Sequence, residues 1–504
     1  MAVQISNMIN IPRNISFSAL LPFAITAIFF YLGGLCVYRL FFHPLAKFPG
    51  PKLAAVTRYY EAYYDIIQNG QYTFKIKELH EKYGPIIRIS PFELHINDSD
   101  FHKQLYQQDG IWNKYEWSMN AFLAKGSTIC TVEHEVHKRR RAPLNPFLSK
   151  VSVTRKQDVI QSHVDKFCSR MGDHVGSTIS FGCAISAFTR DVANDFLLGK
   201  KFNNLDRQDF NAGLTTMFQR SGYVWRTTKH IPWFGLFLRS LPLSVIEKMG
   251  ENGAKEFLRF VMENMQLVRD ITADPGPDAQ STIIHAILNS NLPPEEKSLD
   301  RLDLEVGTIT GAAFETSAQT LRCIFYHVYA HAEILGRVRA ELATVKSQEL
   351  SQLQQLPYLT AVITEGLRLS PGLATRLARI APHRDLLYNS WVIPKGTPVG
   401  MTNFLLHRDE GVYPNPTQFD PQRWLNTDGP KKNDRTFAPF SKGTRHCLGL
   451  HLAWAEMYMV LAAIVQRFDL DFTGVQPEDF EPTSDQFIIG TQSDIKAKLS
   501  LIDQ

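Results

Sequence analysis

The sequence lacks the cysteine pairs that a disulfide framework or a zinc site requires. Its six cysteines are scattered over 504 residues, and none belongs to a C-x-x-C pair. A reducing compartment for most of the chain fits this pattern best. The chain also carries little net charge, +4 at pH 7, so its composition gives no indication of nucleic-acid binding. There is no internal repeat and no low-complexity tract, and 44% hydrophobic and 21% charged residues are typical of a globular protein.

One long segment has no charge at all. Residues 17–38 read FSALLPFAITAIFFYLGGLCVY, and as a helix they would span ~33 Å, enough to cross the core of a bilayer. A cleaved signal peptide is the alternative, but the run is long for a signal and no clear small-x-small cleavage site follows it. Basic residues follow the run, beginning with Arg39 and Lys47, whereas only Arg13 precedes it. The positive-inside rule therefore places the body of the chain in the cytosol.

These features predict four parts. We expect a short lumenal N-terminus at 1–16, a transmembrane anchor at 17–38, a proline-rich hinge at 39–52 that ends in KFPGPK, and a cytosolic domain at 53–504.

The domain is predicted to be mainly α with a small β portion. Helical periodicity dominates from about Val153 to Gln355, and no proline interrupts Glu295–Leu356. Short alternating or β-branched runs occur at Ile86–Ile96, at Trp391–Met401 and near the C-terminus.

A single cysteine lies in the glycine-containing loop FSKGTRHCLG. A lone cysteine is usually a small buried hydrophobe. Here Gly443 and Gly449 give the backbone on both sides of Cys447 unusual freedom, and Arg445 with the next residue puts positive charge beside the sulfur. The sequence after Gly449 predicts a helix, whose first amides favour a negative sulfur. The loop is therefore suited to hold a soft metal centre by its thiolate.

The long predicted helix contains GAAFETS. Glu315 and Thr316 put an acid and a hydroxyl into an otherwise apolar helix, which is costly unless they are paired or used. The alternative is that Glu315 faces solvent and Thr316 bonds back to its own helix.

Two further motifs are weak when taken alone. Glu365 and Arg368 are three residues apart on a predicted helix and can pair, with Arg423 as a second cation, although such pairs are usually solvated surface bridges. His137 and Arg141 share one face of a basic helix, which is either a solvated face or a site for an anionic cofactor or acidic partner.

The order of these motifs along the chain makes them specific. The pattern F-x-x-G-x-R-x-C-x-G is matched at every fixed position, and the acid–threonine helix, E-x-x-R and an arginine in FDPQRWL precede it. In this the sequence resembles the cytochrome P-450 family of haem-thiolate monooxygenases, over essentially the whole chain. FFHPLAKFPGPKLAA further resembles the junction in membrane-anchored members from the secondary metabolism of filamentous fungi. The resemblance implies the cytochrome P-450 fold, preceded by one transmembrane helix.

The resemblance also implies a role for each matched residue. Cys447 would be the axial thiolate of haem iron, which favours O–O bond cleavage. Glu315 and Thr316 would deliver protons during the activation of dioxygen. Arg379 would bind a haem propionate, with Arg376 as the alternative. The implied cofactor-binding residues are His137, Arg141, Arg379, Phe440, Arg445 and Gly449. The implied structural triad is Glu365, Arg368 and Arg423.

The function implied is insertion of one oxygen atom from O2 into a lipophilic small molecule, a terpenoid or polyketide intermediate. Haem b would be the cofactor, and electrons from NADPH would arrive through an FAD/FMN reductase. The chain would be a single-pass protein of the endoplasmic reticulum. Aromatic residues in Gly110–Gly126 and Gly222–Leu243 would form the pocket roof and the membrane-facing entrance, unless they are ordinary core packing.

Two other functions stay open at this point. The chain could be a haem-thiolate isomerase or dehydratase that does not use O2, against which the acid–threonine pair argues. It could also be a non-catalytic, membrane-anchored haem sensor, against which the aromatic pocket regions argue.

Overall fold

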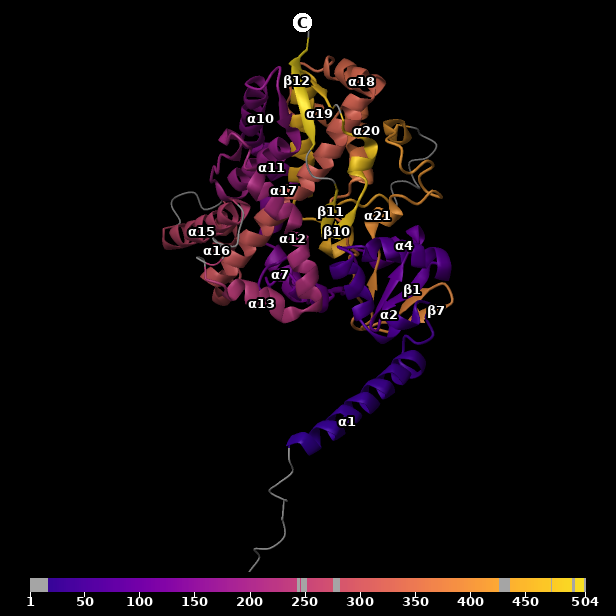
Figure 1. The fold of residues 1–504 in the computed structure, drawn as a ribbon. Coiled ribbons are helices and arrows are strands. Elements are labelled where there is room, and N and C mark those ends of the chain that lie inside the picture. The colour runs from indigo at the N-terminus through magenta and orange to yellow at the C-terminus, as the bar shows by residue number, and fades with distance from the viewer. Residues whose placement is uncertain are drawn as a thin grey trace, which may run out of the picture.

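The computed structural model describes residues 17–242, 245, 252–274, 282–425, 436–472, 474–491 and 495–502. The predicted lumenal segment 1–16 and Leu243 lie outside these ranges. The described chain is mainly helical with small sheets, as predicted (Figure 1). The helices are α1 (Phe17–Val37), α2 (Lys52–Val56), α3 (Tyr59–Ala62), α4 (Tyr72–Tyr83), α5 (Ser99–Leu105), α6 (Glu116–Asn120), α7 (His134–Arg141), α8 (Leu144–Phe147), α9 (Lys150–Arg155), α10 (Gln157–Gly172), α11 (Phe181–Leu198), α12 (Ala212–His230), α13 (Pro232–Ser240), α15 (Asn252–Ala273), α16 (Ile283–Leu288), α17 (Leu299–Ala330), α18 (Ala332–Leu342), α19 (Leu350–Leu353), α20 (Pro357–Leu369), α21 (Asn403–Leu406) and α23 (Leu450–Val465).

Helix α17 crosses the middle of the helical body, between α11, α15, α20 and α23 (Figure 1). From Phe314 to Val328 its residues are buried nearly all round, and Phe314, Ala318 and Leu321 have no exposed surface. A helix that is apolar on most sides is stable only when neighbours cover it, and the main hydrophobic core forms around it.

The β portion occurs where the short alternating runs predict it, and Ile86–Ile96 forms the antiparallel pair β1–β2. The main sheet has the order β1-β2-β8-β5-β3. The strands are β1 (Ile86–Ser90), β2 (Glu93–Ile96), β3 (Asn113–Lys114), β4 (Thr178–Ser180), β5 (Arg379–Ile380), β6 (Leu386–Tyr388), β7 (Trp391–Ile393), β8 (Pro398–Gly400), β9 (Phe468–Asp471), β10 (Ser484–Gln486), β11 (Ile488–Gly490) and β12 (Lys496–Leu501).

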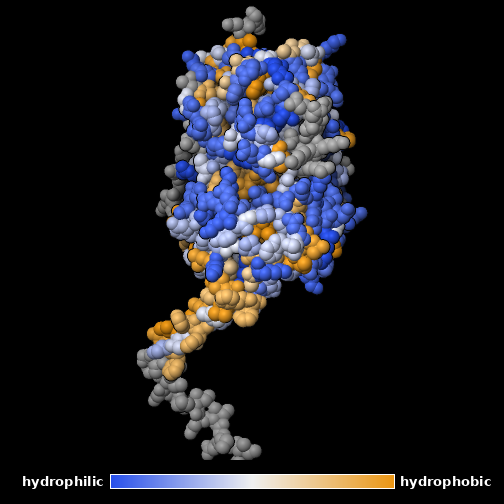
Figure 2. Space-filling view, turned by 90° about the vertical axis from the view of Figure 1, so that its right-hand side faces the viewer, coloured by the Kyte–Doolittle hydropathy of each residue, from blue (hydrophilic) through white to orange (hydrophobic). Residues whose placement is uncertain are grey.

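Helix α1 projects away from the body and is continued by the π-helix η1 (Tyr38–Phe42) (Figure 1). Within the described residues, Leu21–Phe42 is the stretch long and apolar enough to cross a membrane, with a mean hydropathy of 1.9 and no burial in the rest of the chain. Figure 2 shows this hydrophobic helix emerging from a body whose surface is largely hydrophilic. It is a candidate membrane anchor.

The segment 39–52, which we expect to be a hinge, makes several contacts with the body. Leu45 and Phe48 are only 2% and 5% exposed, and the Phe48 ring stacks on Trp391 at 5.0 Å between centroids. The Arg39 guanidinium donates to the Val56 carbonyl, and the Arg88 guanidinium donates to the Arg39 carbonyl at 2.8 Å. The segment is a packed connection, because burial of its apolar residues Leu45 and Phe48 stabilises the folded chain.

This packing predicts different outcomes for two truncations. Removal of residues 1–37 should release the body from membranes at least partly and leave its thermal unfolding unchanged. Removal of 1–46 should also release it, but should lower the free energy of unfolding by about 2 kcal/mol, because the burial of Leu45 is lost. Membrane sedimentation and thermal melts would measure both effects. Identical melts for the two proteins would contradict the structural role of Arg39 and Leu45.

Candidate active site

The loop before α23 is a tight turn built on Gly443. This residue has φ of +75°, and a Cβ at its position would lie 2.5 Å from the carbonyl oxygen of Gln107. Only glycine avoids both the strain and the clash. The turn is closed by a hydrogen bond of 2.8 Å from the Cys447 amide to the Phe440 carbonyl.

Cys447 faces open space although it precedes a helix that is buried along most of its length. The residue is exposed, and nothing lies within 4 Å of where a Cβ on Gly449 would be. Burial in the surrounding protein raises the pKa of the Cys447 thiol, whereas the Gly449 amide and the Arg141 guanidinium lower it. The loop therefore presents an accessible cysteine with an amide and a cation beside its sulfur.

Five nitrogen-bearing side chains with no carboxylate partner gather around the cysteine loop: the basic residues Lys114, Arg141, Arg379 and Arg445, and the neutral ring of His137. Burial, with Arg379, Arg445 and Arg141 nearby, lowers the pKa of Lys114 to about 7. Burial and the same cations lower the pKa of His137 to about 2. Within the described part of the chain, no carboxylate lies at ion-pair distance from any of the five, and Nε of Arg445 has no hydrogen-bond partner. Uncompensated buried cations are costly, so this arrangement fits a bound dianion such as the two propionates of haem.

Lys114 joins this group although the sequence analysis did not select it. Strand β3 pairs with β5 so that Lys114 lies opposite Arg379. Arg376, the alternative to Arg379, lies elsewhere, since its guanidinium bonds Glu61 at 2.9 Å and Glu93 at 2.7 Å. The sequence gives one weak indication of a role for Lys114, which is its position as a basic residue within the aromatic segment Gly110–Gly126.

One face of α17 is open. A Cβ on Gly307 or Gly311 would have no atom within 4 Å, and Ala312 is exposed. The Thr316 hydroxyl lies along this face and donates to the Ala312 carbonyl at 2.8 Å. Thr316 therefore bonds back to its own helix, as the alternative interpretation expected, while lining a space with small residues.

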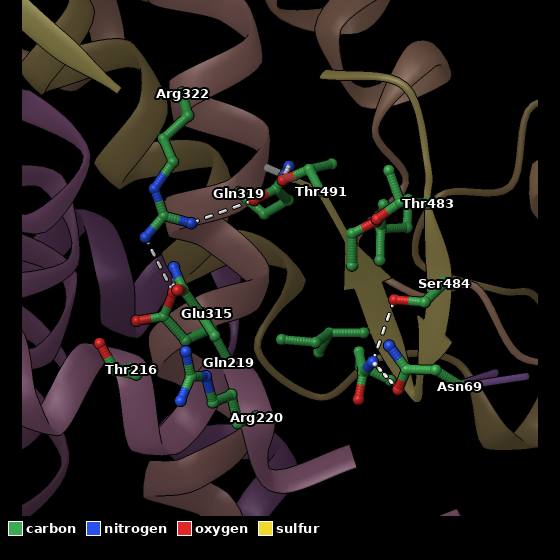
Figure 3. A pocket seen from close by; sticks show the side chains of 14 residues that line it. Asn69, Thr216, Gln219, Arg220, Glu315, Gln319, Arg322, Thr483, Ser484 and Thr491 are labelled. Carbon is green, nitrogen blue, oxygen red and sulfur yellow. Dashed lines mark hydrogen bonds and ion pairs between the residues drawn. The ribbon is translucent and has the colours of Figure 1, made fainter. Parts of the chain in front are cut away.

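Glu315, one turn after Gly311 and next to Thr316, is buried and paired. Its carboxylate accepts a hydrogen bond of 2.9 Å from Arg322 (Figure 3), and it lies 3.7 Å from Arg190. It does not face solvent, but it borders a polar cavity of about 220 Å³ between α12, α17 and the β10–β11 hairpin. Other residues lining this cavity include Gln219, Arg220, Gln319, Thr483 and Thr491. Glu315 is therefore engaged by arginines, whereas the neighbouring Thr316 borders open space.

Glu365, Arg368 and Arg423 do meet. Arg368 donates two hydrogen bonds of 2.8 Å to the Glu365 carboxylate, and Arg423 donates one of 2.9 Å. The Trp424 indole adds a bond of 2.9 Å, and both members of the E-x-x-R pair are fully buried. This is a buried network rather than a solvated surface bridge.

His407 connects this network to the cysteine loop. Its Nδ1 lies 3.2 Å from the Arg368 carbonyl, and its Nε2 accepts from the Ala438 amide at 3.0 Å. Asn403 also donates to the Ala438 carbonyl. Since Ala438 is two residues before Phe440, the network supports the loop that carries Cys447.

The aromatic residues expected in the substrate pocket divide between two roles. Trp112 is 1% exposed and belongs to a core cluster, so it is ordinary packing. Phe122 and Trp225 instead meet each other and Phe487 in a separate cluster.

Comparisons with known proteins agree with this geometry. The family model described as Cytochrome P450 matches residues 62–497. The chain is 37% identical to the cytochrome P450 monooxygenase MO6277 of Ascocoryne sarcoides, over 88% of this chain and 90% of that protein. It is 36% identical to the tryptophan 6-hydroxylase fscE of Fusarium equiseti, over 90% and 91%, and 35% identical to the conidiogenone synthase PchP450 of Penicillium rubens, over 90% and 92%. A crystal structure of a cytochrome P450 superposes with a TM-score of 0.69 at 17% identity, over 85% of this chain and 94% of that one.

Proposed function

The chain belongs to the cytochrome P450 family of haem-thiolate monooxygenases, and from this premise we propose that it inserts one oxygen atom from O2 into a terpenoid or polyketide intermediate. The observation that carries the proposal is the exposed Cys447 in a loop beside the buried arginines Arg141, Arg379 and Arg445, which lack carboxylate partners.

In this proposal each residue near the sulfur has a definite task. Haem, when bound, supplies the oxygen-activating chemistry, and the protein supplies its ligand, orientation and proton path. The Cys447 thiolate would be the metal ligand. Lys114, Arg141, Arg379 and Arg445 would hold the propionates as cations. His137 would bind as a neutral ring, because its pKa is lowered to about 2.

Thr316 and Glu315 would move protons. The Thr316 hydroxyl donates to the Ala312 carbonyl, which leaves its oxygen lone pairs free to accept a hydrogen bond on the open face. Glu315 would pass protons from the polar cavity to Thr316. Its Oε1 atom has no hydrogen-bond partner among the described residues, and Glu315 borders that cavity. Passage of a proton would require the Glu315 carboxylate to leave Arg322.

The proposed substrate class rests on a cluster of aromatic side chains in this chain rather than on the activities of its relatives. A tryptophan 6-hydroxylase and a conidiogenone synthase are almost equally similar to it, at 36% and 35% identity. The aromatic cluster of Phe122, Trp225 and Phe487 favours a bulky apolar molecule.

The place of the reaction would be the cytosolic face of the endoplasmic reticulum, with electrons delivered from NADPH by an FAD/FMN reductase. α13 supports attachment to the membrane beyond α1, because Trp233, Leu236 and Phe237 are more than half exposed. α13 and α2 lie at the end of the body from which α1 emerges (Figure 1).

A substitution at Thr316 tests the reaction itself. Thr316→Val keeps the shape of the side chain but removes the hydroxyl, so haem binding and NADPH consumption with the reductase should persist. Product per NADPH should fall, and hydrogen peroxide should rise to match, because positioned proton transfer is generally worth ~10²–10⁴-fold. Mass spectrometry of products and a peroxide assay would measure the two yields.

Thr310→Val is the matched control. Thr310 lies on the same helix and bonds back to the Val306 carbonyl at 2.7 Å, but it is fully buried. It should leave the coupling unchanged. Wild-type coupling in Thr316→Val would refute the proton path, and absence of reductase-dependent NADPH consumption with any lipophilic substrate would refute the monooxygenase reaction.

A further inference from the structure

Three aromatic rings from distant parts of the chain meet in one cluster. Phe122 follows α6, Trp225 lies on α12, and Phe487 is the turn residue between β10 and β11. Their ring centroids are 4.7 Å apart for Phe122 and Phe487, 5.3 Å for Trp225 and Phe487, and 5.9 Å for Phe122 and Trp225. We call these three residues the aromatic cluster.

The aromatic cluster is connected to the open face of α17. The Phe487 carbonyl accepts a hydrogen bond from the Ala374 amide, and the Ile489 amide donates to the Gly372 carbonyl. A Cβ on Gly372 would lie 3.4 Å from the Cβ of Thr316. The β10–β11 turn therefore holds the Phe487 end of the cluster against the same short loop that touches Thr316.

The backbone that carries the cluster is held in place. Phe487 and Leu123, the residue after Phe122, have φ of 72° and 56°, a region that large side chains rarely adopt. The Phe487 amide donates to Asp485 Oδ1 at 2.9 Å, and the Arg226 guanidinium donates to the Asp485 carbonyl. Strain that is maintained in this way is typical of functional sites.

Helix α12 lies directly on the turn. A Cβ on Gly222 would be 2.3 Å from the Cα of Gln486, so only glycine permits this approach. The Lys229 ammonium lies 4.7 Å over the Trp225 ring and is itself held by Asp65 at 2.6 Å. The orientation of the indole is therefore set before any ligand binds.

The Trp225 indole N–H is buried and has no acceptor within the described part of the chain. Trp225 is 6% exposed, and its Nε1 lacks a hydrogen bond. A buried tryptophan usually finds a partner for this group.

We propose that Trp225 donates a hydrogen bond from Nε1 to an oxygen atom of the substrate, while the rings of Phe122 and Phe487 pack against its hydrocarbon skeleton. This inference deepens the proposed function and rests on it. The substrate is then a lipophilic molecule that already carries a carbonyl or hydroxyl oxygen. An earlier oxygenation of the skeleton, or a step that retains oxygen while building it, has to supply the molecule.

Imidazole-tethered decalins test the hydrogen bond in the full-length haem-loaded enzyme. The imidazole group of each probe binds the haem iron and so anchors all probes in the same way. Each probe carries one ketone at a different ring position of the decalin. The decalin without a ketone is the parent hydrocarbon used for comparison. Titrations followed at the Soret band give each affinity. At least one ketone should bind about tenfold more tightly than the parent hydrocarbon, equivalent to about 1.4 kcal/mol. Trp225→Phe should abolish this preference and leave the affinity for the hydrocarbon unchanged.

The matched control is Trp233→Phe, which changes an exposed tryptophan on α13 and should keep the ketone preference. If Trp225→Phe fails to retain haem, ultraviolet resonance Raman spectra of the wild type decide instead. The preferred ketone, but not the hydrocarbon, should shift an indole band that is sensitive to hydrogen bonding. The inference is overturned if no ketone is preferred, if the preference survives in Trp225→Phe, or if the indole band stays unmoved. Absence of any imidazole-induced spectral change would instead reject the haem function on which the inference depends.

Discussion

Cys447→Ser should abolish the strongly red-shifted Soret band of the ferrous carbonyl complex. That band reports thiolate ligation of haem iron, and a neutral serine hydroxyl is a poor substitute for a thiolate. The loss should be complete rather than partial, because the exposed Cys447 is the only cysteine in the loop before α23. Product formation should disappear with the band. The measurement is the carbon monoxide difference spectrum of the reduced protein.

The other cysteines of the body provide the controls for this experiment. Cys130, Cys168 and Cys323 are buried, and Cys183 is partly buried. Burial raises the pKa of the Cys130, Cys168 and Cys323 thiols, which disfavours the thiolate form. Each changed singly to serine should leave the band in place. A red-shifted band in Cys447→Ser would refute the assignment of the ligand.

Glu365→Ala should yield protein that does not retain haem. The Glu365 carboxylate accepts hydrogen bonds from Arg368, Arg423 and Trp424. Its removal leaves the fully buried Arg368 guanidinium without its anion, which costs ~3–5 kcal/mol. The damage should reach the cysteine loop through His407, which joins the Arg368 backbone to Ala438. Haem content after purification and thermal unfolding would measure the effect.

Glu78→Ala offers a comparison with the same spacing and a different environment. Glu78 pairs with Lys75 at 2.6 Å across three residues of α4, but its side chain is 62% exposed. An exposed pair of this kind is worth roughly 0–1 kcal/mol, so the variant should melt like the wild type and keep its haem. A haem-replete, thermally normal Glu365→Ala would show that burial does not decide the role of the E-x-x-R pair.

The parts of the site that could be predicted from the sequence are those whose constraints are local. The turn around Cys447 requires glycine at Gly443 within a few residues of the sulfur, and a short pattern captures it. The pair of Glu365 and Arg368 lies on one face of one helix, and helical spacing predicts it.

Other parts depend on tertiary packing that no local pattern contains. Lys114 reaches the buried cations only because β3 pairs with β5. Glu315 is a lone acid in an apolar helix until α11 brings Arg190 beside it and α17 turns Arg322 toward it. The prolines of 39–52 are compatible with both a free hinge and a packed connection, and the burial of Leu45 and Phe48 decided the outcome.

The packed connection from Tyr38 to Phe48 also governs how much substrate the enzyme experiences. With the candidate anchor α1 in a bilayer, this packed connection would hold the body close to the lipid leaflet, and exposed apolar residues of α13 lie at the end of the body from which α1 emerges. A lipophilic substrate partitions into that leaflet, so its local concentration there exceeds the concentration calculated over the whole volume. An enzyme fixed at this boundary can therefore have a weak intrinsic affinity and still be saturated. Released into detergent-free buffer, the same active site should require more total substrate to reach the same turnover.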